Sequence, residues 1–231
     1  MLHFISNAIS RGTFSIFGFL SYLLSTLAVI FITMPIHEWA HGFLSSKLGD
    51  PTPRWQGRLT LNPMAHIDKR GALFILLFGI GWAKPVQVNA RYYKNPKSGM
   101  ALVALAGPVA NLVLSLFVLI LYYLFSLFNL SVTLFIAKFL FYISYISVYL
   151  AVFNLIPIPP FDGSRILFTF LPQKYYFKIM QYEQYIFIGL LALFLIDSRI
   201  GIISGTIGFV ATKLLNMLAS IARLPFKIFG V

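Results

Sequence analysis

Four runs of apolar residues, each long enough to cross a lipid bilayer, dominate this sequence. A transmembrane helix needs roughly 17 to 25 such residues, and the runs lie at about 14–36, 101–128, 131–156 and 200–222, with a shorter one at about 184–196. The chain of 231 residues is 59% hydrophobic and has a mean hydropathy of +0.85. A water-exposed domain of this size could not carry that composition without large apolar patches. The sequence therefore predicts an all-α polytopic membrane protein with about five to six transmembrane helices.

The charged residues indicate how the spans are oriented. Lys and Arg give the chain a formal net charge of +12, and they gather in the loops at 47–100 and 160–180, whereas the turn near 129–132 has none. By the positive-inside rule both loops are cytoplasmic, so we expect a multi-pass protein of the cell membrane, surrounded by lipid. The basic residues form no cluster on one polar element and do not predict a nucleic-acid partner. The sequence does not indicate the oligomeric state of the protein.

The stretch from 48 to 98 differs from the helical remainder. The segments GRLTLNP (57–63) and KPVQVNAR (84–91) alternate apolar with polar residues, which is typical of short strands. Between them, GALFILLFGIGW (71–82) supplies only about 15 Å of helix, half of what a bilayer core requires. We therefore expect a short membrane-associated β and re-entrant element.

The chain contains no repeat, low-complexity tail or long linker that would separate a second folded unit. The sequence predicts one membrane-embedded domain over residues 1–231. Its core covers about 14–172, two additional spans cover about 182–222, and residues 1–13 form a short interfacial segment.

The sequence His37-Glu38-Trp39-Ala40-His41 places two histidines and a glutamate inside an apolar stretch. On a helix, residues i and i+4 lie on one face a turn apart, so both imidazoles could bind one Zn²⁺ with the glutamate as a catalytic base. The alternative is a pair of core histidines beside a buried glutamate. Ionisable groups are expensive inside a membrane helix and usually mark a functional site, which favours the metal site.

A catalytic zinc ion usually takes three protein ligands, so a third ligand must come from elsewhere in the chain. The chain has no Cys, which leaves His, Asp and Glu. Asp162 stands out because a Pro-rich stretch at 157–160 breaks the third long helix just before it, and Gly163 permits a tight turn. On spacing alone, a helix-capping Asp in an ordinary cytoplasmic loop remains open as the alternative.

Two motifs together resemble those of the site-2 proteases, which are intramembrane zinc metalloproteases with H-E-x-x-H and N-x-x-P-x-x-x-x-D-G sequences. The second motif is matched at Asn154, Pro157, Asp162 and Gly163. The stretches AGPVANL (106–112) and GWAKPVQVN (81–89) resemble the family's second core helix and its membrane-associated loop. The resemblance covers about residues 30–170 and is to the minimal form without a PDZ or CBS module.

This resemblance implies the roles of five residues. His37, His41 and Asp162 would bind one catalytic zinc ion, Glu38 would be the general base, and Asn154 would hold substrate or the oxyanion. The implied substrates are transmembrane proteins, cleaved in or near their membrane segments.

Two further residues are less clearly assigned. Asn111 could belong to the site, but a hydrogen bond between helices explains a polar residue there equally well. The sequence His66-Ile67-Asp68-Lys69 departs from the H-I-D-P often found in the family, which leaves His66 without an assigned role.

Two other functions fit parts of the sequence. A metal-ion transporter would also carry polar groups in broken helices, but apart from Asp162 the later long spans offer no His, Asp or Glu for a continuous path. A non-catalytic scaffold that binds membrane proteins could keep a structural zinc, but it would not need Glu38. The sequence therefore favours a zinc metalloendopeptidase whose active site opens towards the cytoplasm.

Overall fold

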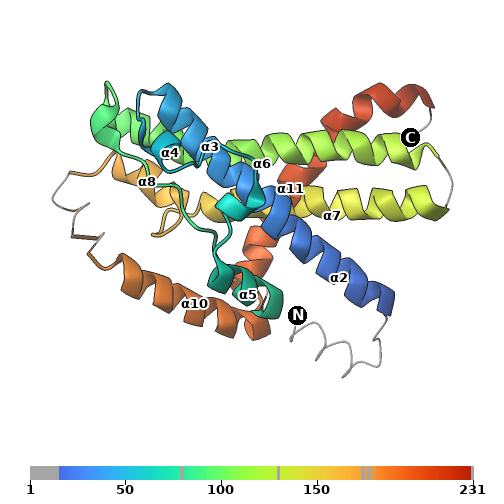
Figure 1. The fold of residues 1–231 in the computed structure, drawn as a ribbon. Coiled ribbons are helices and arrows are strands. Elements are labelled where there is room, and N and C mark those ends of the chain that lie inside the picture. The colour runs from blue at the N-terminus through green and yellow to red at the C-terminus, as the bar shows by residue number, and fades with distance from the viewer. Residues whose placement is uncertain are drawn as a thin grey trace.

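The structure is a computed structural model that describes residues 16–78, 81–128, 131–172, 175, 178–179 and 181–229. The interfacial segment expected at 1–13 lies outside these residues. Every regular element in the described chain is a helix (Figure 1). The α-helices are α2 (Ile16–Ala28), α3 (Met34–Lys47), α4 (Thr52–Trp55), α5 (Lys69–Phe78), α6 (Pro96–Ser126), α7 (Ser131–Asn154), α8 (Asp162–Phe168), α10 (Glu183–Ile200) and α11 (Ile202–Arg223). The π-helix η1 (Val29–Thr33) and the 3-10 helices η2 (Pro63–Ala65), η3 (Ala90–Tyr92) and η4 (Leu224–Phe229) complete the set.

Four helical segments of the described chain are long and apolar enough to cross a membrane, namely Leu23–Lys47, Pro96–Ser126, Phe135–Asn154 and Ile202–Lys227. This confirms the all-α multi-pass architecture. The predicted count of five to six spans is not confirmed, because the apolar part of α10, Glu183–Phe194, is shorter than a span.

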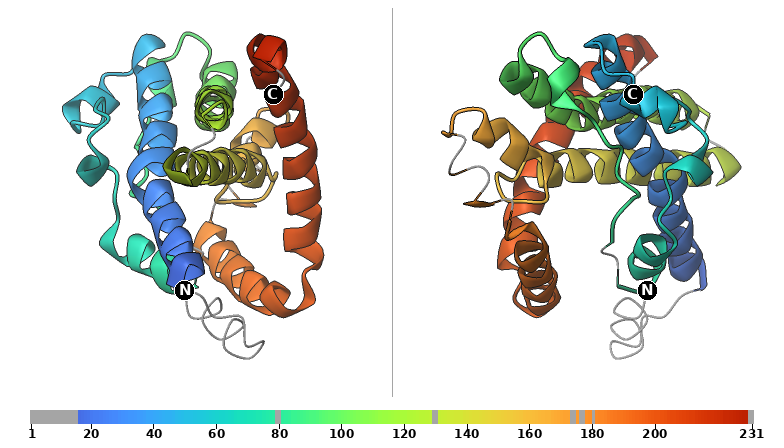
Figure 2. Two further views of the ribbon diagram at one scale, coloured as in Figure 1. Left: turned by 90° about the vertical axis from the view of Figure 1, so that its right-hand side faces the viewer. Right: turned by 60° about the vertical axis from the view of Figure 1, so that its left-hand side comes forward.

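The antiparallel helices α6 and α7 form the centre of the bundle. Figure 2 shows them between α3 on one side and α11 on the other, and both neighbours pack against α6. The buried face of α6 carries small and polar residues such as Gly107, Asn111 and Ser115, while Val113 and Phe117 are exposed on its outer face. Small residues let helix backbones approach closely inside a membrane, where lipid covers the apolar outer faces.

The first span is one continuous helix with a π-helical turn in front of the HEWAH sequence. Met34 N–H donates to Val29 O, five residues back, and Pro35 follows within the first turn of α3. Proline has no N–H for an α-helical bond to the residue four positions earlier, so the wider turn absorbs the irregularity. The turn sets the angle from which α3 enters the bundle.

The predicted break in the third long helix is confirmed. α7 ends at Asn154, residues 155–161 are not helical, and α8 begins at Asp162. The chain folds back tightly here, because a side chain at Gly163 would lie 2.2 Å from the carbonyl oxygen of Leu155. A residue larger than glycine would push the start of α8 away from the end of α7.

The predicted strands are absent, because the described residues contain no regular strand. Residues 81–89 run without helical structure along α3, and their backbone is bound by other groups: Lys84 N–H donates to His66 O, Val86 N–H to Glu38 and Asn89 N–H to Asp50. The alternating pattern therefore belongs to an irregular segment, in which Val86 is buried between the exposed Pro85 and Gln87. The half-length helix expected within 71–82 is present as α5.

Candidate metal centre

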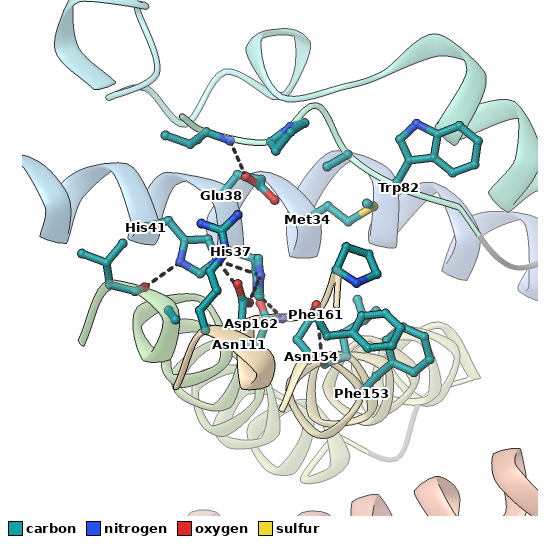
Figure 3. Close-up of a pocket in the computed structure, with 18 of the residues that line it drawn as sticks. Met34, His37, Glu38, His41, Trp82, Asn111, Phe153, Asn154, Phe161 and Asp162 are labelled. Carbon is teal, nitrogen blue, oxygen red and sulfur yellow. Dashed lines mark hydrogen bonds and ion pairs between the residues drawn. The ribbon is translucent and has the colours of Figure 1, made fainter. Parts of the chain in front are cut away.

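Three potential ligands converge between α3 and the start of α8 (Figure 3). The Nε2 atoms of His37 and His41 lie 3.0 Å apart, and Asp162 Oδ2 lies 3.1 Å from the first and 3.3 Å from the second. Both histidines are buried and Asp162 is nearly so. The structure therefore brings together the three residues that the sequence predicted as ligands.

Each ligand is positioned by its own helix. His37 and His41 stand one turn apart on one face of α3, as the i, i+4 spacing requires. Asp162 is the first residue of α8, where its carboxylate is set against the positive end of the helix. The break before α8 turns this carboxylate towards α3.

The chemistry of these atoms fits a cation. His41 Nδ1 lies 2.7 Å from the carbonyl oxygen of Val103, so this nitrogen carries the proton and Nε2 keeps a lone pair. That lone pair faces the other imidazole and the carboxylate. Asp162 Oδ2 is buried and accepts no hydrogen bond from the described residues. Two imidazoles and a carboxylate are a common ligand set for catalytic zinc, which keeps its fourth position open.

Glu38 lies beside the ligands on the side of residues 81–89. Its Oε2 accepts a hydrogen bond from Val86 N–H at 2.9 Å. The side chain is half-buried and lines the same cavity as the three ligands. One carboxylate oxygen is thereby fixed by the backbone, so the group is oriented without being neutralised by a cation.

The cavity next to the ligands has a volume of about 410 Å³. Aromatic pairs form its walls, with Trp82 against Phe187 of α10 at 5.6 Å and Phe153 against Phe161 at 4.5 Å between ring centroids. Ligand sites are typically apolar cavities with a few convergent polar groups, and this one is large enough for several residues of a peptide. α10 therefore contributes to the site, although it follows the last ligand in the sequence.

The other residues considered from the sequence are placed differently. Asn154 lines the cavity, and its amide donates to Leu150 O at 2.9 Å within its own helix. Asn111 is buried beside His37. His66 lies outside the ligand cluster, where its Nε2–H donates to Thr60 O at 2.8 Å.

Two buried charged residues hold the segment that carries Val86. Arg58 donates to the backbone oxygens of Ala65, Lys84 and Pro85, which joins the two predicted strand regions. At the other end, Asp50 accepts from Asn89 N–H at 2.7 Å. Burial acts to raise the pKa of the Asp50 carboxyl, but hydrogen bonds from Thr52, Asn89 and Ser45 outweigh it and hold the pKa below its ordinary value. Asp50 is therefore an ionised anchor for the segment.

Two other contributions to the site were not predicted from the sequence. Gly107 of α6 lies directly against both ligand imidazoles, and a backbone N–H, that of Val86, binds the predicted base. Gly107 stands four residues before Asn111, so its place on the same helix face was the only available signal. The contact with Val86 depends on an irregular segment and had no signal in the sequence.

Comparison with known proteins shows which family this chain resembles. Residues 129–196 match the sequence family "Peptidase family M50". The chain is 40% identical over 188 residues to "Putative zinc metalloprotease YwhC" of Bacillus subtilis, a match that covers 76% of this chain and 84% of the relative. It is 29% identical over 147 residues to "Zinc metalloprotease MJ0392" of Methanocaldococcus jannaschii, covering 64% of this chain and 34% of the relative. No solved structure matches significantly.

A helix bundle that crosses the membrane and carries an H-E-x-x-H helix against an Asp on a broken helix defines an intramembrane metalloprotease. The match to YwhC covers most of both chains and shows the family. The chain belongs to peptidase family M50 and is a zinc metalloprotease.

Proposed function

We propose that this protein hydrolyses peptide bonds in or near the transmembrane segments of other membrane proteins, and that His37, His41 and Asp162 hold its single zinc ion. The observation that carries the proposal is the meeting of the three ligand atoms within 4.8 Å, beside Glu38 and a cavity between apolar helices. A membrane-embedded site of this kind is reached most directly by a substrate that is itself in the membrane.

Glu38 is the general base in this proposal. When bound, zinc supplies Lewis acidity, which polarises a peptide carbonyl and makes water a stronger nucleophile at neutral pH. Glu38 accepts a proton from the attacking water and later returns it to the leaving amine. The hydrogen bond from Val86 N–H holds one carboxylate oxygen in place and so limits the rotation of the base.

Asn154 assists by binding substrate or the oxyanion. It lines the cavity at the end of α7, and its amide N–H is engaged with Leu150 O. Rotation of the side chain would free this donor for a developing negative charge, the kind of interaction that stabilises acyl-transfer transition states.

The active site faces the cytoplasm. The basic stretches that contain α4 and α8 lie at the same end of the bundle (Figure 1), and positive loops remain on the cytoplasmic side. Lys47 ends α3 ten residues after His37, so the metal lies about 15 Å from that end at 1.5 Å per residue. Water would reach the site through the broken segment at 155–161.

The whole chain acts as one membrane domain of five spans. α10 has 18 residues and lines the cavity, so it serves as a tilted or shortened span that closes the site. α5 is a re-entrant helix that enters and leaves the membrane on the cytoplasmic side, because its 10 residues reach only about 15 Å.

Residues 81–89 bind the substrate as an extended strand. Val86 and Val88 occupy alternate positions, which share one side in an extended chain, and Val88 N–H is the group that this proposal assigns to the substrate. Both valines line the cavity. A peptide bond in a helix must be unwound before hydrolysis, and pairing with an extended segment would stabilise the unwound form.

Replacing Val88 with Pro is expected to impair cleavage while leaving zinc content unchanged, because it removes one N–H from the strand that binds substrate. Cleavage of a single-span membrane protein and zinc per chain would be measured together. Gln87→Ala is the control at the neighbouring position, since Gln87 is exposed and does not line the cavity. Unchanged cleavage by Val88→Pro would remove strand pairing from the proposal.

The proposed function is tested by removing and restoring the metal. Purified protein in lipid vesicles is treated with a chelator, then given one equivalent of zinc, with a single-span membrane protein as substrate. We expect cleavage to fall to background and to return with zinc, with the cut located by mass spectrometry in or near the membrane segment. Zinc crossing the vesicle membrane without cleavage would instead indicate a transporter, and zinc binding with neither activity would indicate a scaffold.

A further inference from the structure

One face of α6 lies against both metal-binding histidines. Val103, Gly107 and Asn111 follow one another at intervals of four residues, so they share a face of the helix. His41 and His37 have the same spacing on α3. Val103 pairs with His41, Asn111 pairs with His37, and Gly107 lies between the two imidazoles (Figure 3).

The hydrogen bond between Val103 and His41 shows how α6 can prepare a histidine to bind a metal. Val103 O accepts the Nδ1–H of His41 at 2.7 Å, which leaves Nε2 free for the metal. Zinc-binding histidines almost always donate their other N–H to such an acceptor, which fixes the ring and raises its basicity. If Nε2 of His37 is to bind the same ion, its Nδ1 must also carry the proton.

The contact with His37 is made by a side chain that can either donate or accept. Asn111 Nδ2 lies 3.2 Å from His37 Nδ1, and Asn111 Oδ1 is buried with no hydrogen-bond partner among the described residues. In this orientation the amide N–H faces His37 Nδ1, so the proton of His37 lies on Nε2, which has His41 Nε2 at 3.0 Å and Asp162 Oδ2 at 3.1 Å as acceptors. With that tautomer His37 has no lone pair to offer a metal.

We propose that Asn111 is a positioning residue that turns its amide when zinc binds, so that its unpartnered oxygen accepts the Nδ1–H of His37. Half a turn of the amide exchanges the oxygen and the nitrogen without moving either helix. With its oxygen on Nδ1, Asn111 holds His37 in the tautomer that leaves Nε2 free for zinc. This inference rests on the proposed role of His37 as a ligand.

The test compares two variants that separate accepting from donating. Asn111→Asp can accept from His37 Nδ1–H but cannot donate, and Asn111→Leu, of similar size, can do neither. Zinc affinity is measured by competition with a chelator of known affinity. We expect Asn111→Asp to bind zinc at least as tightly as the wild type, and Asn111→Leu to bind it about 10- to 100-fold more weakly.

Two outcomes would overturn the proposal. Wild-type affinity in Asn111→Leu would overturn it, and an equal loss in Asn111→Asp and Asn111→Leu would show that Asn111 acts as a donor. Ser115→Ala, which changes the next buried polar residue on the same helix, should leave affinity unchanged. If His37→Ala also kept wild-type affinity, the proposed ligand set itself would be wrong, which is a separate failure.

A second measurement does not depend on the charged variant folding. In the protein loaded with cobalt(II), the ring N–H protons of the ligand histidines give separate, strongly shifted proton NMR signals. We expect the His37 signal to exchange with solvent faster in Asn111→Leu, while the His41 signal, held by Val103 O, stays unchanged. Unchanged exchange of both signals would overturn the proposal.

Discussion

Glu38→Gln is expected to lower the rate of peptide cleavage by about 10²- to 10⁴-fold, the range that general-base catalysis contributes, while the protein still binds one zinc ion. Gln has the shape of Glu, and its side-chain oxygen can still accept the hydrogen bond from Val86 N–H. It cannot take a proton from water at neutral pH. Cleavage and zinc content would be measured on the same preparation.

The chain provides a matched control for this substitution. It has two glutamates, Glu38 and Glu183, and both line the cavity. Glu183→Gln makes the same chemical change on α10, outside the group of three ligands, and should lower the rate far less than Glu38→Gln does. Asp162→Ala should give the opposite pattern to Glu38→Gln, with loss of zinc itself. Cleavage at the wild-type rate by Glu38→Gln would disprove the assigned base.

The half of the proposed metal site that lies on α3 was predictable because its geometry is local. His37 and His41 are separated by four residues, and any α-helix places such residues on one face. The third ligand is different. Asp162 lies far along the chain, and the broken helix only made it a candidate, so the resemblance to a family was needed to select it.

The all-helical bundle was predictable from the length of the apolar runs, but the structure of the segment between 57 and 91 was not. Alternation of apolar and polar residues is typical of a strand, but it does not report what the backbone binds. Here the backbone of residues 84–89 is bound by the side chains of Glu38, Asp50 and Arg58, none of which belongs to that stretch. These side chains form the hydrogen bonds with backbone N–H and C=O groups that a neighbouring strand would otherwise form.

The packing of α6 on α3 could not be predicted from the sequence either, for a physical reason. How closely two helices approach depends on the residues of both at the crossing point, and α6 contains several small residues that could have marked it. Only the structure shows that Gly107 is the small residue at the point where α6 crosses α3. The buried amide of Asn111 was likewise compatible with two roles until its neighbour was known to be His37.

Gly107→Ala is expected to weaken zinc binding by more than about 100-fold, beyond the range typical for loss of an outer hydrogen bond, and cleavage should fall with it. A Cβ at this position would lie 2.5 Å from His37 Cε1 and 2.5 Å from His41 Nε2. These distances are too short for any contact between non-bonded atoms. The imidazoles must therefore move, and both of the nitrogens proposed to bind zinc would be displaced at once. Zinc affinity would be measured by chelator competition.

The effect should come from the site and not from the helix, because Ala stabilises a helix interior by about 1 kcal/mol relative to Gly. Gly205→Ala is the matched control: Gly205 lies within α11, and a Cβ there would have no neighbour within 4 Å. It should bind zinc and cleave substrate as the wild type does. If Gly107→Ala kept wild-type zinc affinity, the close approach of α6 to the two histidines would not exist in the loaded protein. In that case the face of α6 that carries Val103, Gly107 and Asn111 could not be part of the zinc site.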